Sequence, residues 1–536
     1  MRYLRFSVLA CLIFSFCCGA VAQNNISVNE KETLQKLGTT LYIIDNFYVD
    51  SSDLRKVTED AIVGMLKDLD PHSAYISKED VEKANEKLVG SFEGIGVTFQ
   101  LLRDTILVVS PVSGGPSEKV GIMAGDKIVK IDGESSVGKK VDNDYVTKRL
   151  RGKKGSKVLL TVKRGNEKEL IDFEVIRDKI PLNSIDAAFM LDKNVGYIRL
   201  DRFAKSSADE FKASLEKLKK QNMKSLVFDL RGNSGGYLNI AVDLCNEFID
   251  KDKVVVYTEG LHSPKMVEKT KGNGNFVNGG LVVLIDEGSA SASEIVSGAV
   301  QDWDRGVLIG RRSFGKGLVQ RPFMLPDGSL IRLTTARYHT PTGRCIQRSY
   351  DNGTDDYYKE LTKRYNHGEY YHADSIQFPD SLKYATMKNG RTVYGGGGIM
   401  PDIFIPVDTT FSSRLYTDVL RKGVMNRYVM DYVLENRDAV KEKYPVFESY
   451  NDSFEITDSM IDDLRTLAEK EGVTWDEEQY KRSEKLLKMQ IKALIARNIW
   501  DIENYYQVTM REDDAVKKAL EVLHNKKMYN DILNGK

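Results

Sequence analysis

The stretch from Val282 to Gln320 constrains the fold most, because it predicts a strand, a tight turn, a helix and a second strand in that order. The apolar run Val282–Ile285 is typical of a buried strand. The small residues 289–292 form the turn, and apolar side chains then recur at helical spacing as far as Trp303. This order places a serine hydroxyl and the free amides of a helix N-terminus at the carboxyl end of a strand, where open α/β sheets bind ligands. We therefore expect an α/β protein with a site at this sheet edge.

Two residues of the stretch are a candidate nucleophile and a candidate base. Ser291 stands at the mouth of the expected helix, and Lys316 stands between Gly315 and Gly317 in the loop after the next strand. A closely packed lysine loses its charge more readily than a solvated one and can then accept the proton of a serine hydroxyl. The extended residues after the loop put Gln320 on the same face as Lys316, where its amide could hold the amine.

Simpler interpretations of these residues remain open. Ser291 to Glu294 fits the S-x-x-E capping box, in which the serine only caps the helix. Lys316 taken alone fits a solvated loop lysine. Gly310 to Lys316 also reads G-x-x-x-x-G-K, the start of a phosphate-binding P-loop. That motif needs Ser or Thr where Gly317 stands and a helix where an extended run follows, so a nucleotide site is disfavoured.

A second strand–turn–helix unit precedes the first. The strand Ser225–Asp229 runs into the glycine-rich turn 232–236, and a helix follows. If the two strands are neighbours, the two turns meet at one sheet edge. An amide of Gly235 or Gly236 would then join the amide of Ala292 as an oxyanion hole, aimed where charge develops on an attacked carbonyl. The alternative is that the glycines only turn the chain.

The domain organisation is predicted from changes of pattern along the 536 residues. Strands and helices alternate in the middle of the chain, as a mostly parallel sheet requires, with short strands before them and helical patterns at both ends. The expected division is a signal peptide at 1–22, a helical arm at 23–88, a small β-rich domain at 89–178, an α/β domain at 179–410 with an insertion at 351–394, and a helical domain at 411–536.

The N-terminus predicts export. Arg2 and Arg5 precede the apolar run 6–16, and Ala20-Val21-Ala22 is an A-x-A cleavage site. We therefore expect cleavage after Ala22 and delivery to the periplasm or cell envelope. The apolar run is too short to span a membrane, and no later run reaches that length.

Composition bears on partners and cofactors. The 78 basic and 78 acidic residues balance, so nothing indicates a nucleic-acid partner. After cleavage only Cys245 and Cys345 remain, so we expect no disulfide framework. No motif implies a metal or another cofactor. The helical patterns at the two ends are candidate surfaces for homo-oligomer formation.

The β-rich segment resembles a PDZ domain, the small module that receives a peptide's C-terminus. Two stretches carry the resemblance, the loop Gly94-Ile95-Gly96-Val97 and the turn and strand Gly125-Asp126-Lys127-Ile128. The amides of the first stretch would cradle a terminal carboxylate while the peptide adds a strand beside it. The alternative is that these glycines only turn a barrel corner.

The motifs over residues 91–406, together with one just before them, resemble those of the C-terminal processing peptidases, also called tail-specific proteases. They occur in the family's order: Leu69-Asp70-Pro71-His72-Ser73, Gly94-Ile95-Gly96-Val97, Asp229-Leu230-Arg231-Gly232-Asn233-Ser234-Gly235-Gly236, Gly288-Ser289-Ala290-Ser291-Ala292-Ser293-Glu294, Phe314-Gly315-Lys316-Gly317, Tyr338-His339-Thr340-Pro341-Thr342-Gly343-Arg344 and Gly397-Gly398-Ile399-Met400-Pro401-Asp402.

The resemblance implies an endopeptidase that acts near the free, apolar C-termini of protein substrates through a Ser-Lys dyad. Ser291, Lys316 and Gln320 occupy the family's catalytic positions. Two departures stand out: Asn233-Ser234 replaces the usual Asn-Pro, and the insertion 351–394 puts substrate access in question. A non-catalytic PDZ scaffold stays an alternative. So does a Ser-His-Asp hydrolase, which would use a histidine at position 72 or 339.

Overall fold

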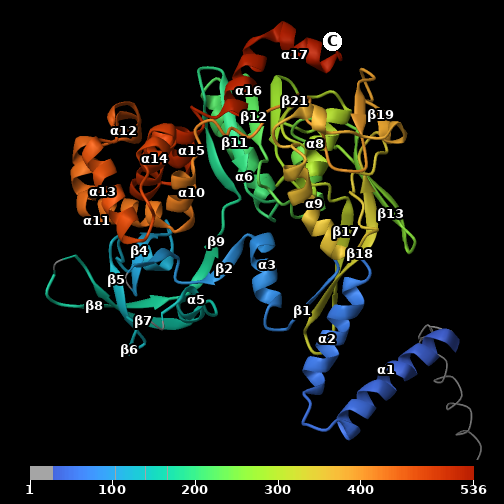
Figure 1. Cartoon of the computed structure of the whole chain (residues 1–536), viewed down its shortest axis with the longest axis horizontal. Helices are drawn as coiled ribbons and strands as arrows, with labels where there is room; N and C mark the ends of the chain where they lie inside the picture. Colours follow the sequence, from blue (N-terminus) through green and yellow to red (C-terminus); the bar gives the residue numbers. More distant parts are fainter. Residues whose placement is uncertain (1–27, 103, 139–140, 166) are drawn as a thin grey trace, which may run out of the picture. The chain divides into compact units, whose positions relative to one another are not determined.

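The computed structural model describes residues 28–102, 104–138, 141–165 and 167–536 (Figure 1). The expected signal peptide at 1–22 lies outside these residues. The chain divides into two compact units after Leu69. Among the described helices, none combines the length and apolar character needed to cross a bilayer.

The first unit contains the two helices α1 (Val28–Phe47) and α2 (Leu54–Lys67), which the apolar spacing predicts. Asp53 caps α2 by accepting hydrogen bonds from the backbone N–H groups of Arg55 and Lys56, at 3.0 and 3.3 Å. Large apolar side chains of α1, among them Phe47, are exposed. Association of copies through this arm stays a prediction.

The second unit begins with the turn 70–73, which the sequence analysis placed in the helical arm. Oδ1 of Asp70 accepts hydrogen bonds from the N–H of His72 (2.8 Å), the N–H of Ser73 (2.9 Å) and Oγ1 of Thr334 (3.0 Å). After this turn the chain forms β1 (Ala74–Ile76) and then α3 (Val81–Val89). The strand β1 pairs antiparallel with β18 (Leu330–His339). Residues 70–88 belong to the second unit because the Asp70 carboxylate joins them to a strand far along the chain.

A small β-module follows. Its sheet has the strand order β3-β4-β5-β7-β8, with β6 beside β5, so β3 is an edge strand. The side chains of α5 pack with those of the strands into one apolar core. A separate pair, β2 with β9, joins the module to the rest of the chain. The elements are β2 (Ser91–Gly94), β3 (Val97–Leu102), β4 (Thr105–Pro111), α4 (Pro116–Lys119), β5 (Lys127–Ile131), β6 (Glu134–Ser135), α5 (Asn143–Leu150), β7 (Lys157–Lys163), β8 (Ile171–Ile176) and β9 (Asp178–Pro181).

The central sheet confirms the predicted α/β class. Its strand order is β10-β11-β12-β15-β16-β21, and only β10 runs antiparallel to its neighbour among these strands. The inner strands are nearly continuous apolar runs because both faces of the sheet are buried. The strands are β10 (Ile185–Met190), β11 (Val195–Leu200), β12 (Ser225–Asp229), β15 (Gly280–Ile285), β16 (Val307–Gly310) and β21 (Ile403–Phe404).

Helices cover both faces of this sheet (Figure 1). On one face lie α6 (Ser207–Lys220), α7 (Leu238–Cys245) and α8 (Ala292–Asp302), within one apolar core. On the other lie the last helices, α16 (Asp514–His524) and α17 (Lys526–Leu533), in a second core.

The remaining helices of the C-terminal segment form a core of their own. The sequence analysis grouped all of residues 411–536 together, whereas the last two helices pack on the sheet. The helices with the separate core are α10 (Arg414–Arg421), α11 (Val424–Lys443), α12 (Phe447–Ser453), α13 (Asp458–Lys470), α14 (Glu477–Ile499) and α15 (Ile502–Thr509).

A second sheet in the same unit has the order β1-β18-β13-β14, with β17 also paired to β18. Its further strands are β13 (Val254–Gly260), β14 (Ser263–Lys269) and β17 (Leu318–Met324). The expected insertion contains α9 (Thr354–Asn366), two short 3-10 turns (Ala373–Ser375 and Asp380–Leu382) and the hairpin β19 (Lys383–Ala385) and β20 (Thr392–Tyr394).

Candidate active site

The two glycine- and serine-containing turns meet at one sheet edge, as the sequence predicts. They follow β12 and β15, which are adjacent parallel strands. The carbonyl of Asn233 accepts hydrogen bonds from the N–H of Ala290 (3.0 Å) and Oγ of Ser293 (2.8 Å). A Cβ atom at Gly235 would lie 2.8 Å from Cβ of Ser291, so only glycine fits beside the serine.

Ser291 has a strained backbone. It is the N-cap residue of α8, with φ 55° and ψ −113°. A positive φ in a residue other than glycine costs about 1–3 kcal/mol and persists only where the surroundings hold it. The carboxylate of Glu294 supplies part of that hold by accepting a hydrogen bond from the N–H of Ser291 at 2.8 Å. The capping box predicted from S-x-x-E is therefore present, and a serine can cap a helix and also act as a nucleophile.

Lys316 lies in a loop that other backbone approaches closely. A Cβ atom at Gly315 would lie 3.1 Å from the nitrogen of Gly398, and one at Gly317 would lie 2.8 Å from the nitrogen of Gln347. Burial lowers the pKa of the lysine below its ordinary value.

Charged groups around Lys316 act in both directions. The guanidinium of Arg332 lowers its pKa further, whereas the carboxyl groups of Glu294 and Asp70 raise it. Because burial dominates, the neutral amine is favoured relative to a lysine in water.

Two buried side chains join the serine turn to the lysine loop. Oε2 of Glu294 accepts hydrogen bonds from the N–H of Ser291 (2.8 Å) and the N–H of Lys316 (2.9 Å). Oη of Tyr338 lies within hydrogen-bond distance of the carbonyl oxygens of the same two residues, at 3.1 Å from that of Ser291. The backbones of the candidate nucleophile and base are thus held by the same two groups.

Glu294 is fully buried and also organises the rest of the loop. Its Oε1 accepts hydrogen bonds from Oγ of Ser313 (2.5 Å) and the N–H of Gly315 (2.6 Å). Burial raises the pKa of Glu294 to about 7, although its hydrogen bonds favour the ionised form. Sequence reasoning found Glu294 only as a capping residue, because a capping box does not reveal partners 19 or more positions away.

The structure gives Gln320 a partner other than the lysine amine. Its Nε2 donates to Oγ1 of Thr334 at 3.2 Å, and Thr334 in turn donates to Asp70. The hydrogen bonds between described residues therefore do not join Gln320 to the amine of Lys316. Orientation of the amine by Gln320 stays a prediction.

The amides expected to form an oxyanion hole differ in availability. The N–H of Gly235 donates to Oδ1 of Asn233 at 2.8 Å, so it is occupied in this structure. The backbone hydrogen bonds between described residues do not use the N–H groups of Gly236 or Ala292. These two amides are the better candidates.

The alternative sites find less support. Nε2 of His72 lies 2.9 Å from Oη of Tyr357, and Nδ1 of His339 lies 3.1 Å from the carbonyl oxygen of Gly343, so the hydrogen bonds of both rings go to groups other than Ser291. Gly310 to Lys316 leads into the strand β17 rather than the helix that a P-loop requires. Within the described residues, no three His, Cys, Asp or Glu side chains are grouped to hold a metal ion.

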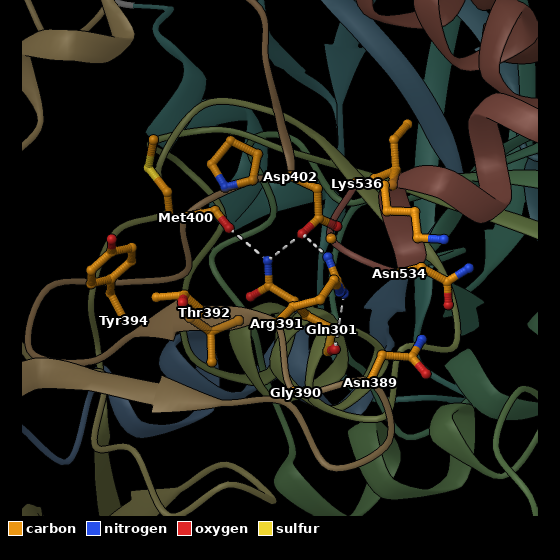
Figure 2. A pocket seen from close by; sticks show the side chains of 14 residues that line it. Gln301, Asn389, Gly390, Arg391, Thr392, Tyr394, Met400, Asp402, Asn534 and Lys536 are labelled. Atoms are coloured by element: carbon orange, nitrogen blue, oxygen red, sulfur yellow. Dashed lines mark hydrogen bonds and ion pairs between the residues drawn. The ribbon is translucent and has the colours of Figure 1, made fainter.

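The opposite end of α8 is anchored by a polar cluster beside a cavity of about 590 Å³ (Figure 2). Arg391 donates to Asp402 at 2.7 Å, and Nε2 of Gln301 donates to the carbonyl of Met400 at 2.8 Å. At 1.5 Å per residue, about 15 Å of helix separates Gln301 from Ser291. This cavity is therefore not part of the candidate active site.

The loop Gly94-Ile95-Gly96-Val97 connects β2 to the edge strand β3. The N–H and Oγ of Ser117 donate to the carbonyl of Ile95, at 3.0 and 2.7 Å, and the N–H of Val112 donates to the carbonyl of Gly96 at 2.9 Å. Gly96 has φ +72°, which favours glycine. The carbonyls of Ile95 and Gly96 thus bond within the module, next to the edge strand β3.

Family models match four parts of the chain. Residues 194–356 match peptidase family S41, and residues 94–175 match a PDZ domain. Residues 18–80 match the N-terminal domain of the activating protease CtpB, and residues 415–501 match a family of unknown function (DUF8443).

Relatives of the chain include the probable CtpA-like serine proteases of Staphylococcus haemolyticus (strain JCSC1435) and Staphylococcus aureus (strain N315). Each is 36% identical over 325 residues, which is 60% of this chain and 64% of the relative. The chain thus spans slightly less than two thirds of the length of these relatives. The solved structure of a photosystem II D1 C-terminal processing protease is 29% identical and covers 59% of this chain and 90% of its own, with a TM-score of 0.34. The S41 and PDZ matches and the CtpA-like relatives make the chain similar to C-terminal processing serine proteases over 60% of its length.

Proposed function

We propose that this chain is an exported serine endopeptidase that binds the free C-terminus of a protein substrate and hydrolyses a peptide bond near that end. The PDZ segment, 89–178, captures the terminus, and the α/β segment, 179–410, performs the hydrolysis. One observation carries the proposal: Glu294 and Tyr338 hold the backbones of Ser291 and Lys316 together, and burial lowers the pKa of that lysine.

In the proposed first step, Oγ of Ser291 attacks the substrate carbonyl while the neutral amine of Lys316 takes the hydroxyl proton. The N–H groups of Ala292 and of Gly236 donate to the oxyanion that forms, and Gln320 orients the amine. The ammonium of Lys316 then gives the proton to the leaving amine, and an ester to Ser291 remains. Water attacks this ester with the amine as base, which releases the product and restores the serine.

In the proposed recognition, the substrate adds a strand to β3. This strand has an open edge, and the side chain of Phe99 on it is partly exposed. The loop 94–97 precedes β3 and would donate amides to the terminal carboxylate.

Amidation of the substrate's C-terminus tests this recognition. Peptides with a free apolar C-terminus should bind full-length Ser291→Ala protein at least ~10-fold more tightly than the same peptides amidated, since a hydrogen bond to a charged group contributes about 1.5–3 kcal/mol. Fluorescence anisotropy with the paired peptides measures the ratio. Equal affinities would refute carboxylate recognition by the PDZ segment.

Glu294→Gln tests the bridge between serine and lysine. The variant keeps the size of the side chain but turns an NH2 group toward donors that need an acceptor, so we expect a loss of about 1–3 kcal/mol of unfolding free energy. We also expect a fall in kcat, because the backbones of Ser291 and Lys316 each lose one of the two side chains that hold them. Glu287→Gln is the matched control, because the Glu287 carboxylate pairs with Arg311 at 2.7 Å rather than with the backbone of Ser291 or Lys316. A Glu294→Gln protein with unchanged stability and kcat would contradict the bridge.

The raised pKa of Glu294 predicts that the stability of the wild type, relative to Glu294→Gln, depends on pH. The folded pKa of Glu294, about 7, lies above its ordinary value of 4.5. Its contribution to stability is therefore present below pH 4.5 and is lost as the pH rises through about 7. The wild type should lose stability relative to Glu294→Gln between these pH values, which urea unfolding at a series of pH values measures.

A further inference from the structure

The C-terminal helix α16 contacts the chain next to the glycine-rich turn 232–236. Arg231 immediately precedes this turn. Its Nη1 donates to Oδ2 of Asp513 at 2.8 Å, and its Nη2 lies 3.5 Å from Sδ of Met510. Asp513 is the N-cap residue of α16, and Oδ1 of its carboxylate accepts a hydrogen bond from the N–H of Val516 at 2.9 Å. One carboxylate therefore caps the helix and also joins it to the residue before the turn.

Strand β12 holds the same guanidinium from the other side. Its last residue, Asp229, is fully buried and accepts hydrogen bonds from Nε (3.0 Å), Nη2 (2.7 Å) and the backbone N–H (2.9 Å) of Arg231. The side chains of Arg231 and Asp513 are only 17% and 21% exposed. Two carboxylates thus share one largely buried guanidinium, and loss of the charge of Asp513 leaves Arg231 paired with Asp229.

Hydrogen bonds connect this stretch to the turn that contains the candidate nucleophile. The carbonyl of Leu230 accepts from the N–H of Asn233 at 3.2 Å and from Oγ of Ser289 at 2.8 Å. The carbonyl of Asn233 accepts from the N–H of Ala290 at 3.0 Å, and its Oδ1 accepts from the N–H of Gly235 at 2.8 Å. Residues on both sides of Arg231 are therefore bonded to the serine turn, and Asn233 also holds the first glycine of the pair 235–236.

A cavity of about 620 Å³ lies beside the contact between Arg231 and Asp513. Its lining includes Arg231, Gly232 and Asp286 from the sheet edge, and Asp513 and Lys517 from α16. The N–H of Gly232 donates to Oδ1 of Asp286 at 2.8 Å. Because the guanidinium borders open space, its position depends on its hydrogen bonds as well as on packing.

We propose that Asp513 is a positioning residue, which acts through Arg231 to hold the turn 232–236 where the amide of Gly236 meets the oxyanion. This inference rests on the proposed Ser-Lys function. A hydrogen bond to the oxyanion forms only as the carbonyl is attacked, so a displaced donor lowers kcat without weakening the binding of the substrate. Helix α16, which lies outside the peptidase match at 194–356, then contributes directly to the geometry of the site.

The test is the kinetics of full-length Asp513→Asn on an unstructured peptide substrate. Asparagine is also a good N-cap, and its Oδ1 can still accept from Val516, but it turns an NH2 group toward the donating guanidinium. We expect kcat to fall about 10-fold with KM unchanged, because loss of a whole oxyanion donor costs roughly 100- to 1,000-fold and here the donor is only displaced. Asp514→Asn is the matched control. It removes the same charge from the next residue, which is exposed, and should leave kcat unchanged.

A peptide aldehyde provides a second readout, which reports on the oxyanion itself. Oγ of Ser291 forms a bond to the aldehyde carbon, the hydroxyl proton passes to the amine of Lys316, and the electron pair of the C=O π bond moves to the oxygen. The inhibition constant of the aldehyde should rise about 10-fold in Asp513→Asn, since this adduct resembles the transition state. That of the matching peptide alcohol, which has no carbonyl to attack, should stay the same. General loosening of the fold would not separate the two inhibitors.

Unchanged kcat in folded Asp513→Asn would overturn the proposal. So would a fall in kcat without a change in the ratio of the two inhibition constants, because Asp513 would then act on something other than the oxyanion. If Asp513→Asn does not fold, Asp513→Ser, which also caps a helix, is measured with the same expected results. Peptide cleavage by folded Ser291→Ala would instead refute the proposed dyad, so the two failures are distinguishable.

Discussion

Ser291→Ala protein is expected to fold and to bind peptides, but to lose about four to six orders of magnitude in turnover. Removal of the nucleophile from a catalytic unit has effects of this size, because only binding and oxyanion stabilisation remain. If Ser291 were no more than a helix cap, alanine would cost about 1 kcal/mol of stability and the folded fraction would stay active. Initial rates of peptide cleavage, measured together with thermal unfolding, separate the two cases.

Ser297→Ala is the matched control on the same helix. Oγ of Ser297 donates to the backbone carbonyl of Ser293, one turn earlier at 2.8 Å, so the change leaves the turn and the loop untouched. This variant should cleave at nearly the wild-type rate. Normal cleavage by folded Ser291→Ala would refute the dyad. An unchanged cellular phenotype with Ser291→Ala would favour a PDZ scaffold that binds tails without cutting them.

Lys316→Arg is expected to be inactive at every pH at which the protein is folded. The guanidinium stays protonated and cannot accept the proton of a serine, although it keeps the positive charge and approximate length of lysine. In the wild type, burial lowers the pKa of Lys316, so activity should rise with pH below the ordinary lysine value of 10.5. Peptide hydrolysis across the pH range measures both.

Two comparisons make the lysine experiment specific. Lys205→Arg changes an exposed lysine of the same domain and should leave the rate of peptide hydrolysis unchanged. His339→Ala should keep activity if it folds, because the imidazole stacks on Tyr257 with centroids 4.7 Å apart. Peptide hydrolysis by Lys316→Arg would refute the hypothesis that Lys316 is the general base. Loss of activity in His339→Ala alone would support the alternative in which a histidine is the base.

The local patterns of the core are sufficient to predict its elements. The strand Ser225–Asp229 has the expected bounds, because apolar periodicity and turn residues act within a few positions of one another. The meeting of the two turns is also predictable, since consecutive parallel strands joined by helices tend to be neighbours. Sequence reasoning therefore reaches the fold class and the candidate Ser291 and Lys316.

What these residues touch was decided by the tertiary structure. Glu294 bonds Ser291 within its own turn, but its other partners lie in a loop that a strand separates from α8. Gln320 donates to Thr334 on the neighbouring strand, and the N–H of Gly235 donates to Asn233. Several donors and acceptors of the same chemistry could pair with each of these groups, and which pair forms depends on distances that no local pattern contains.

The same reason explains the placement of whole elements. The apolar face of α16 (Asp514–His524) is buried, but against the central sheet rather than the other C-terminal helices. Likewise, the glycines and charges of 311–317 predict a tight loop, whereas its cover by α9 depends on the hydrogen bonds of Arg364 and on the stacking of Arg348 against Tyr357. The sequence by itself determined the elements and the reactive residue types, because these follow from neighbours along the chain. Only the tertiary structure decided which surfaces and donors meet, because burial and hydrogen bonding depend on groups brought together from distant positions.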